Sequence, residues 1–198
     1  MIKRAIISVS DKSKLEDLIK ALEKYSVEII SSGGTANRIR EIGYEKLVEV
    51  SKYTGYPESP DGLVKTLHPK IHGGLLLDRN NSEHMVWMEE NGIKPIDLVV
   101  CNLYPFEAVI SKGADLEMAC HNIDIGGPTM MRSAAKAGLL YDSVCIVTSK
   151  NQYPELIREL EQNKGEITRE LRRKYALEAF KRTRDYEKTI VSFLEEKL

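Results

Sequence analysis

The sequence is poor in cysteine and has no long apolar run, and each shortage excludes a class of protein. Its three cysteines, Cys101, Cys120 and Cys145, show no C-x-x-C spacing and cannot form a closed disulfide framework. Cys101 and Cys145 lie in or at the end of apolar runs, where buried reduced thiols are common, so a catalytic cysteine is disfavoured. No apolar run approaches the ~20 residues of a membrane span, and the apolar part of the first ten residues is too short for a signal peptide. We therefore expect a cytoplasmic protein that has no membrane partner.

An excess of charge of either sign is also missing. The 29 lysines and arginines nearly balance the 30 aspartates and glutamates, so no basic footprint for nucleic acid exists and no such partner is expected. Internal repeats, low-complexity tracts and Pro/Ser-rich linkers are absent as well. A length of 198 residues is typical of one domain with a full core. We predict a single domain over residues 1–198, with an α/β core over 1–150 and a helical part over 151–198.

Short apolar runs alternate with stretches of helical spacing. Runs of strand length lie at 4–9, 27–30, 47–50, 73–77, 97–101 and 143–148. From Tyr153 onward the chain is expected to be helical, with breaks near Gly165 and Arg184, and its balanced charges suggest a solvated helical cap. Strands that alternate with helices predict an α/β fold with a mainly parallel, wound sheet.

Two of the predicted strands end in small polar residues that lead into helices. Ser10-Asp11-Lys12 follows the first strand, and Ser31-Ser32-Gly33-Gly34-Thr35 follows the second. Free N–H groups and the dipole at the start of a helix attract anions, and glycines allow a ligand to approach closely. Plain capping or turn chemistry is the alternative for each segment. Because adjacent parallel strands present these turns to one crevice, the pair favours a phosphate site.

The segment 61–74, D-G-L-V-K-T-L-H-P-K-I-H-G-G, is too irregular for an ordinary helix or strand, and we interpret it as a long ordered functional loop. Lys65 and Thr66 together suit an anionic ligand. His68 and His72 are four residues apart, but a proline separates them and no further ligand has metal spacing, so no metal site is expected.

Two later segments are candidates for the other walls of the same pocket. Asn102 and Tyr104 follow the strand at 97–101, and Tyr104 is either a core aromatic or a ligand contact. Asp124-Ile125-Gly126-Gly127-Pro128 opens a helix that runs to about Ala137, and its first N–H groups can bind an oxyanion. Lys136 reaches the pocket only if that helix runs alongside it.

Five motifs occur in an order that resembles one family: S-V-S-D-K (8–12), S-G-G-T (32–35), V-K-T-L-H-P-K-I-H-G-G (64–74), N-L-Y-P-F (102–106) and D-I-G-G-P-T-M-M-R-S-A-A-K (124–136). The chain resembles the IMP cyclohydrolase (inosinicase) domain of the bifunctional AICAR formyltransferase/IMP cyclohydrolase enzyme of purine synthesis. The resemblance implies a methylglyoxal synthase-like, three-layer αβα fold. It also implies a homodimer that closes 5-formamidoimidazole-4-carboxamide ribotide (FAICAR) to inosine monophosphate (IMP) without a metal or organic cofactor.

The chain departs from the family pattern in three places. Leu63 stands where many relatives carry arginine, and Ala-Gly follows Lys136 where Asn-His is frequent. The sequence ends at Leu198, roughly where relatives continue into a formyltransferase domain. Two expectations stay open: either a separate AICAR formyltransferase is a partner that adds the formyl group, or the chain is a fragment of the bifunctional enzyme.

The resemblance also implies residue roles. It assigns the proton transfers to Lys65, Tyr104, Asp124 and Lys136, and leaves open which residue is the acid and which the base. The substrate contacts that it implies are Ser10, Lys12, Ser32, Gly33, Gly34, Thr35, Thr66, Cys101, Asn102, Ile125, Gly126 and Gly127. A methylglyoxal synthase-type lyase and a nucleotide-sensing regulatory domain are the alternatives, but neither requires the four proton-transfer residues together.

Overall fold

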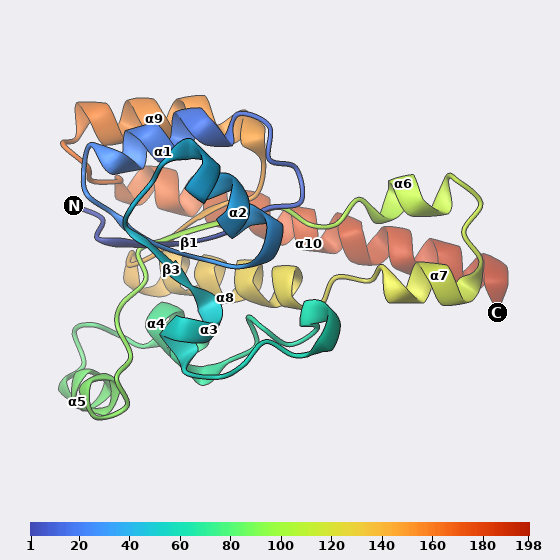
Figure 1. Ribbon diagram of the computed structural model, residues 1–198, viewed down its shortest axis with the longest axis horizontal. Helices are drawn as coiled ribbons and strands as arrows, with labels where there is room; N and C mark the ends of the chain where they lie inside the picture. The colour runs from blue at the N-terminus through green and yellow to red at the C-terminus, as the bar shows by residue number, and fades with distance from the viewer.

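The computed structural model describes residues 1–198, apart from the side chain of Asp61. Across these residues a five-stranded, all-parallel sheet has the order β3-β2-β1-β4-β5. Helices cover both of its faces, so the predicted three-layer αβα fold is confirmed (Figure 1). The strands are β1 (Arg4–Ser8), β2 (Glu28–Ser31), β3 (Leu47–Glu49), β4 (Leu98–Cys101) and β5 (Cys145–Val147).

The helices form two groups about the sheet. One face carries α1 (Leu15–Glu23), α2 (Gly33–Ile42) and α9 (Tyr153–Gln162). The other carries α3 (Val50–Thr54), α4 (Pro69–Leu76) and α8 (Gly126–Tyr141), with α5 (Ser82–Glu90) further out. The long α10 (Arg169–Lys197) packs along α8 and β5, and its C-terminal half extends beyond the sheet, beside α6 (Phe106–Ile110) and α7 (Leu116–His121). Short 3-10 turns lie at Pro60–Gly62 and Lys150–Gln152.

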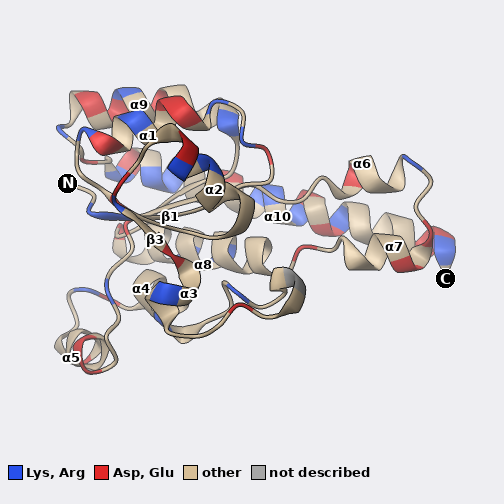
Figure 2. Cartoon of the chain, viewed as in Figure 1, with Lys and Arg blue, Asp and Glu red and all other residues tan. Residues whose placement is uncertain are grey.

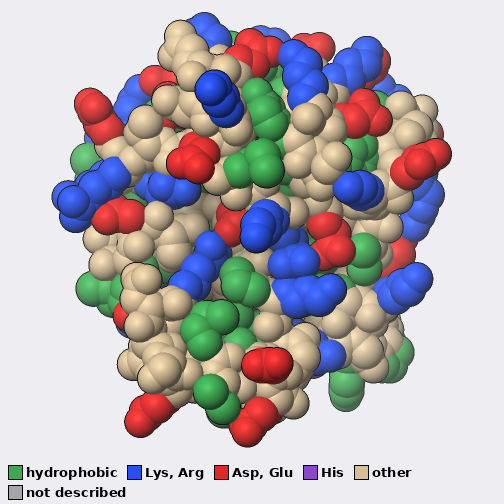
Figure 3. Space-filling view, turned by 90° about the vertical axis from the view of Figure 1, so that its left-hand side faces the viewer, with side chains coloured by type: hydrophobic (Ala, Val, Ile, Leu, Met, Phe, Trp, Pro, Cys, Tyr) green, Lys and Arg blue, Asp and Glu red, His purple; other side chains and the backbone are tan. Residues whose placement is uncertain are grey.

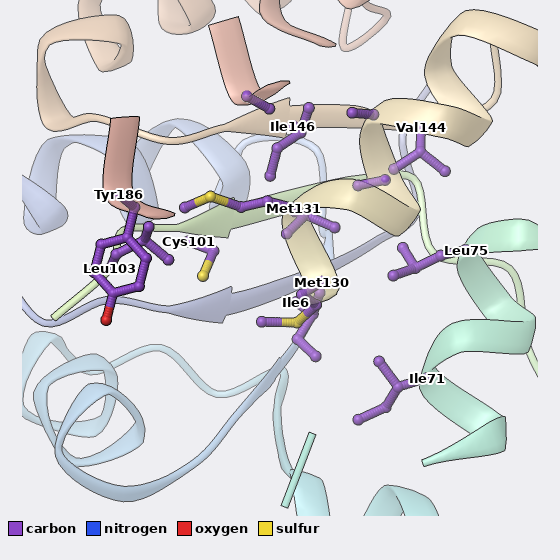
Figure 4. Packing of buried hydrophobic residues seen from close by; sticks show 14 of the residues in the cluster. Ile6, Ile71, Leu75, Cys101, Leu103, Met130, Met131, Val144, Ile146 and Tyr186 are labelled. Atoms are coloured by element: carbon purple, nitrogen blue, oxygen red, sulfur yellow. The ribbon is translucent and has the colours of Figure 1, made fainter. Parts of the chain in front are cut away.

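Successive residues of each strand pack into different layers of the core, as the pleat of a β-strand requires. Ile6 and Val99 join the cluster beneath α8, whereas Ile7 and Val100 join the cluster beneath α1 and α9. Burial on both faces is typical of parallel sheets, and it explains why the strands are uninterrupted apolar runs in the sequence. Figure 4 shows the first cluster, in which Ile6 lies close to Met130.

Helix α4 replaces the strand predicted at 73–77 and shortens the loop predicted at 61–74. Pro69 occupies the first turn, where its missing N–H costs nothing, and His68 Nδ1 accepts a hydrogen bond from the Lys70 N–H at 3.1 Å. Gly74 allows α4 to lie close to the backbone that leads into β4, because a Cβ there would be 2.6 Å from the Lys94 carbonyl oxygen. The prediction missed this helix because its buried face, from Ile71 to Leu75, is short and rich in glycine.

Helix α10 is continuous, so the predicted break near Arg184 is wrong, and so is its interpretation as a solvated cap. Its buried side chains recur every three or four residues from Tyr175 through Thr183 to Phe193, which maintains one face against α8, β5 and α6. Acidic and basic residues alternate along the rest of the helix (Figure 2). The charged residues that suggested a solvated cap therefore lie mostly on its outer surface.

The face around the N-terminus mixes positive and negative side chains (Figure 3). Beneath this surface, the buried Asp97 accepts a hydrogen bond from Arg79 Nη1 at 2.6 Å through its Oδ1, and its Oδ2 accepts the N–H groups of Lys3 and Arg4 at 2.7 and 2.9 Å. In the part of the chain that the structure describes, no helix combines the length and apolarity needed to cross a membrane.

Candidate active site

The site lies at the carboxyl ends of β1 and β4, where the strand order changes direction and α/β proteins bind their ligands. Asn102, directly after β4, holds the turn that follows β1. Its Oδ1 accepts the N–H groups of Ser10 at 2.6 Å and Asp11 at 3.3 Å, and its Nδ2 donates to the Asp11 carbonyl at 3.2 Å. Asn102 therefore shapes the turn, and the Ser10 N–H already has a partner.

The Lys12 side chain lies over the start of α2. A Cβ added at Gly34 would be 3.4 Å from Lys12 Cε and 3.6 Å from its Nζ, which also donates to the Ser10 carbonyl at 3.3 Å. The first N–H groups of a helix lack partners within the helix, and Ser32, the N-cap, supplies no side-chain bond to them among the described residues. A cation and free N–H groups thus face the same space, as the sequence predicted.

Thr35 has a structural role at this position. Its hydroxyl accepts the Val9 N–H at 3.1 Å and donates to the Val9 carbonyl at 3.0 Å, and the residue is buried. The side chain ties the first turn of α2 to the end of β1. Only its backbone N–H remains as a candidate contact for a ligand.

Lys65 reaches the same helix start from the opposite side. Its Nζ is 3.5 Å from the position of a Cβ at Gly33, where φ is +53°, and it forms a 3.4 Å ion pair with Glu58 Oε1. The adjacent Thr66 is buried, and its Oγ1 would be 2.5 Å from a Cβ at Gly126, the first residue of α8. The pair Lys65-Thr66 therefore lies between the N-termini of α2 and α8.

Asp124 precedes α8 and caps it. Its Oδ1 accepts the Gly127 N–H at 2.8 Å, and its own N–H donates to the Tyr186 hydroxyl at 2.8 Å. Burial raises the pKa of the Asp124 carboxyl, while the backbone N–H groups of Gly127 and Tyr104 and the charge of Lys65 act against this rise. The Gly127 N–H is thus occupied, contrary to expectation, whereas Ile125 and Gly126 begin the helix without such a cap.

Two other predicted residues, Tyr104 and Cys101, differ sharply in exposure. Tyr104 is 56% exposed beside Asp124, so it is not a core aromatic. Cys101 is buried among apolar side chains (Figure 4), and burial raises the pKa of its thiol. Its side chain is therefore unreactive, and only its backbone can meet a ligand.

Lys136 does not join the crevice. It follows Gly126 by ten residues on α8, which is about 15 Å along the axis at 1.5 Å per residue. It borders a shallow cavity of about 480 Å³ together with Leu76, Arg132, Ser133, Leu139, Leu140 and Phe180. The helix leads away from the site, so within one copy of the chain Lys136 lies outside the crevice.

His68 and His72, the two histidines of segment 61–74, both contact polar groups of the protein itself. His68 caps α4, and His72 Nδ1 lies 3.0 Å from the Ser133 Oγ, while burial lowers the pKa of both rings. Among the residues that the structure describes, no group of three or more His, Cys, Asp and Glu side chains is arranged to hold a metal ion.

Sequence reasoning missed Glu58, the ion-pair partner of Lys65. The stretch E-S-P-D-G has the composition of an ordinary turn, and no spacing in it signals a pair with a lysine seven residues later. Leu63, the residue that departs from the family pattern, is 70% exposed on the same loop.

The chain is similar in sequence to an MGS-like domain and to bifunctional purine biosynthesis proteins. Residues 14–129 match the model of the MGS-like domain, and residues 134–198 match that of the AICARFT/IMPCHase bienzyme. The chain is 51% identical to the bifunctional purine biosynthesis protein PurH of Persephonella marina, over 98% of this chain and 37% of that protein. It is 49% identical to PurH of Bradyrhizobium diazoefficiens, over 98% of this chain and 36% of that one. The chain thus spans little more than a third of the length of these relatives.

A solved structure, described as the crystal structure of ForH, has the same fold. It superposes with a TM-score of 0.79 at 28% identity, over 96% of this chain and 98% of that chain.

Proposed function

The chain belongs to the MGS-like domain family, and from this membership and the geometry of the crevice we propose that it is an IMP cyclohydrolase, which closes FAICAR to IMP with loss of water. One observation supports the proposal most. Lys12 and Lys65 converge on the first turn of α2, and the capped start of α8 with Asp124 borders the same crevice. A phosphate site and a site for acid–base chemistry therefore adjoin one another.

The 5′-phosphate of the ribotide binds at the first turn of α2. The N–H groups of Gly33, Gly34 and Thr35 donate to its oxygens, and the ammonium group of Lys12 balances its charge. These contacts persist from substrate to product, so they contribute mainly to binding.

Ring closure joins the carboxamide nitrogen to the formyl carbon of the same molecule. Holding the two groups face to face can supply up to ~7–11 kcal/mol of the barrier reduction in well-aligned systems. The former formyl oxygen becomes negative in the tetrahedral intermediate, where the N–H groups of Ile125 and Gly126 can receive it. One such donor is worth about 3–4 kcal/mol.

The proton transfers belong to Asp124, Lys65 and Tyr104. A carboxyl whose pKa is raised by burial is suited to exchange protons near neutral pH, and Asp124 is such a group. The Tyr104 side chain is exposed next to the Asp124 carboxyl, so it can contact a substrate that binds there. A general base must remove the proton of the attacking N–H, and a general acid must protonate the oxygen that leaves as water.

The proposal includes a homodimer. If Lys136 takes part in the same reaction, it must act in the crevice of a second copy of the chain, because its position on α8 lies outside the crevice of its own copy. The apolar side chains around it, Leu139, Leu140 and Phe180, suit contact with another chain. Mixing Asp124→Ala with Lys136→Ala protein tests this point, because a shared site restores part of the lost activity and a site within one chain restores none.

The deciding experiment supplies the purified chain with FAICAR, without added metal or cofactor, and follows IMP by its ultraviolet absorbance. Saturable IMP formation supports the proposal. Tight IMP binding without turnover favours a nucleotide-sensing domain, and methylglyoxal release from dihydroxyacetone phosphate favours the lyase. Starting from AICAR, the chain should make IMP only when a separate AICAR formyltransferase and its formyl donor are added.

A further inference from the structure

Glu58 and Lys65 form an ion pair whose two charged groups lie close to Gly62. The Lys65 Nζ lies 3.4 Å from Glu58 Oε1. A Cβ at Gly62 would be 3.0 Å from that same oxygen and 3.2 Å from the Lys65 Nζ. Gly62 also has a φ of +68°, a conformation that favours glycine. Any side chain at this position would therefore strain the backbone and press against both ends of the pair.

Local hydrogen bonds hold the segment around Glu58 in place. The Tyr56 N–H donates to Thr54 Oγ1 at 3.1 Å on one side of it. On the other side the Gly62 N–H donates to the Ser59 carbonyl at 2.9 Å, and the Val64 N–H donates to Ser59 Oγ at 3.3 Å. Glu58 is thus presented to Lys65 by a closed turn, although its side chain is 44% exposed.

We propose that Glu58 is a positioning residue for the ring closure, acting through Lys65. Its carboxylate holds the lysine ammonium between the first turn of α2 and Asp124, so that Lys65 is already oriented when the substrate enters. The inference rests on the proposed cyclohydrolase function and adds a residue to it.

The charge of Glu58 predicts an unusual kinetic signature. A carboxylate beside the phosphate site repels a phosphorylated ligand, and removing its charge relieves that repulsion. Glu58→Gln should therefore lower kcat while leaving KM unchanged or reduced. Exposed ion pairs contribute little to folding, so the variant should retain its stability. A merely structural role would instead weaken stability, binding and turnover together.

A double-mutant cycle tests whether Glu58 acts through Lys65. We expect Glu58→Gln to reduce kcat by about tenfold to a hundredfold, the range that a misplacement of ~1 Å can cause. In the Lys65→Ala background the same change should have no further effect. The matched control is Glu161→Gln on α9, which removes an exposed carboxylate 2.6 Å from Lys24 and should leave kcat and KM unchanged. An unchanged kcat in Glu58→Gln, or a loss that adds fully to that of Lys65→Ala, overturns the proposal.

A second readout does not depend on turnover. Lysines of the full chain are reductively methylated with ¹³C-formaldehyde, and the Lys65 resonance is identified by its absence in Lys65→Ala. Glu58→Gln should shift this resonance, and Glu161→Gln should not. A shift in a chain that makes no IMP supports the ion pair and overturns the cyclohydrolase function alone. If the Lys65 resonance has the same chemical shift in the wild type and in Glu58→Gln, the positioning role is overturned, even if IMP forms.

Discussion

Replacement of Gly127 by alanine tests whether the position of the Asp124 carboxylate controls catalysis. The added Cβ would lie 2.5 Å from Asp124 Oδ2 and 2.8 Å from Leu103 Cδ2, whereas ordinary contacts begin at 3.4 Å. The carboxylate oxygen must therefore retreat by about 0.9 Å, the difference between 2.5 and 3.4 Å. A misplacement of ~1 Å can cost ~100-fold in rate, so we expect kcat to fall by about tenfold to a hundredfold.

The same variant should remain folded. Alanine within a helix is favoured over glycine by about 1 kcal/mol, which offsets part of the ~1–3 kcal/mol that overpacking costs. We expect the free energy of unfolding to fall by no more than about 2 kcal/mol, measured by urea denaturation with circular dichroism. Catalysis is followed by steady-state IMP formation from FAICAR.

A matched variant separates the carboxylate from the general effect of a helical alanine. Gly73→Ala, in α4, presses on the apolar Ile93 side chain at 3.1 Å and should leave kcat unchanged. If Gly127→Ala turns over at the wild-type rate, the position of Asp124 does not matter to the chemistry, and the assignment of this residue to proton transfer is refuted.

Three further predictions concern binding, protonation and the core. Lys12→Ala should raise KM by about tenfold or more with little change in kcat, because the phosphate contact persists through the reaction; a fall in kcat alone would place Lys12 in the chemistry. Asp124→Asn should lower kcat by more than about tenfold. Because burial raises the pKa of Asp124 above its unfolded value, its contribution to the unfolding free energy falls as the pH rises between the two values and stays low above them. The asparagine variant should lose this pH dependence and be at least as stable at pH 7, and urea titrations showing a less stable variant would contradict the sign. Ile146→Ala, in the centre of the core, should lower the unfolding free energy by about 2–5 kcal/mol, and a smaller loss would show that the cavity collapses.

The sequence predicted the parallel sheet well because its central strands, β1 and β4, are buried on both faces. Ile6 and Ile7 pack in different layers, so the strand becomes a continuous apolar run that is visible without any partner. The turn after β2 was equally visible, since Gly33 and Gly34 follow the run at 27–30 after only two serines. Signals of this kind depend only on residues that are neighbours in the sequence, so they can be recognised without knowledge of the fold.

The remaining features depend on segments that are distant in the chain. Asn102 bonds to a turn 92 residues away, so nothing near it indicates that its amide is engaged. Whether Lys136 meets the crevice depends on the direction of α8 relative to the sheet, which spacing cannot specify. Helix α4 was missed because its apolar face is too short to show a helical period.

The crevice is assembled from turns that follow different strands, from Ser10 near the start of the chain to Asp124 beyond its middle. A ligand that touches all of them binds only when the whole sheet is ordered, so its binding energy adds to the stability of the entire domain. At 100 times its Kd such a ligand adds about 2.7 kcal/mol. For a domain of this size that corresponds to a rise in Tm of roughly 5–10 °C. A thermal-shift screen of phosphorylated compounds would thus identify the ligands of this crevice without any assumption about the reaction.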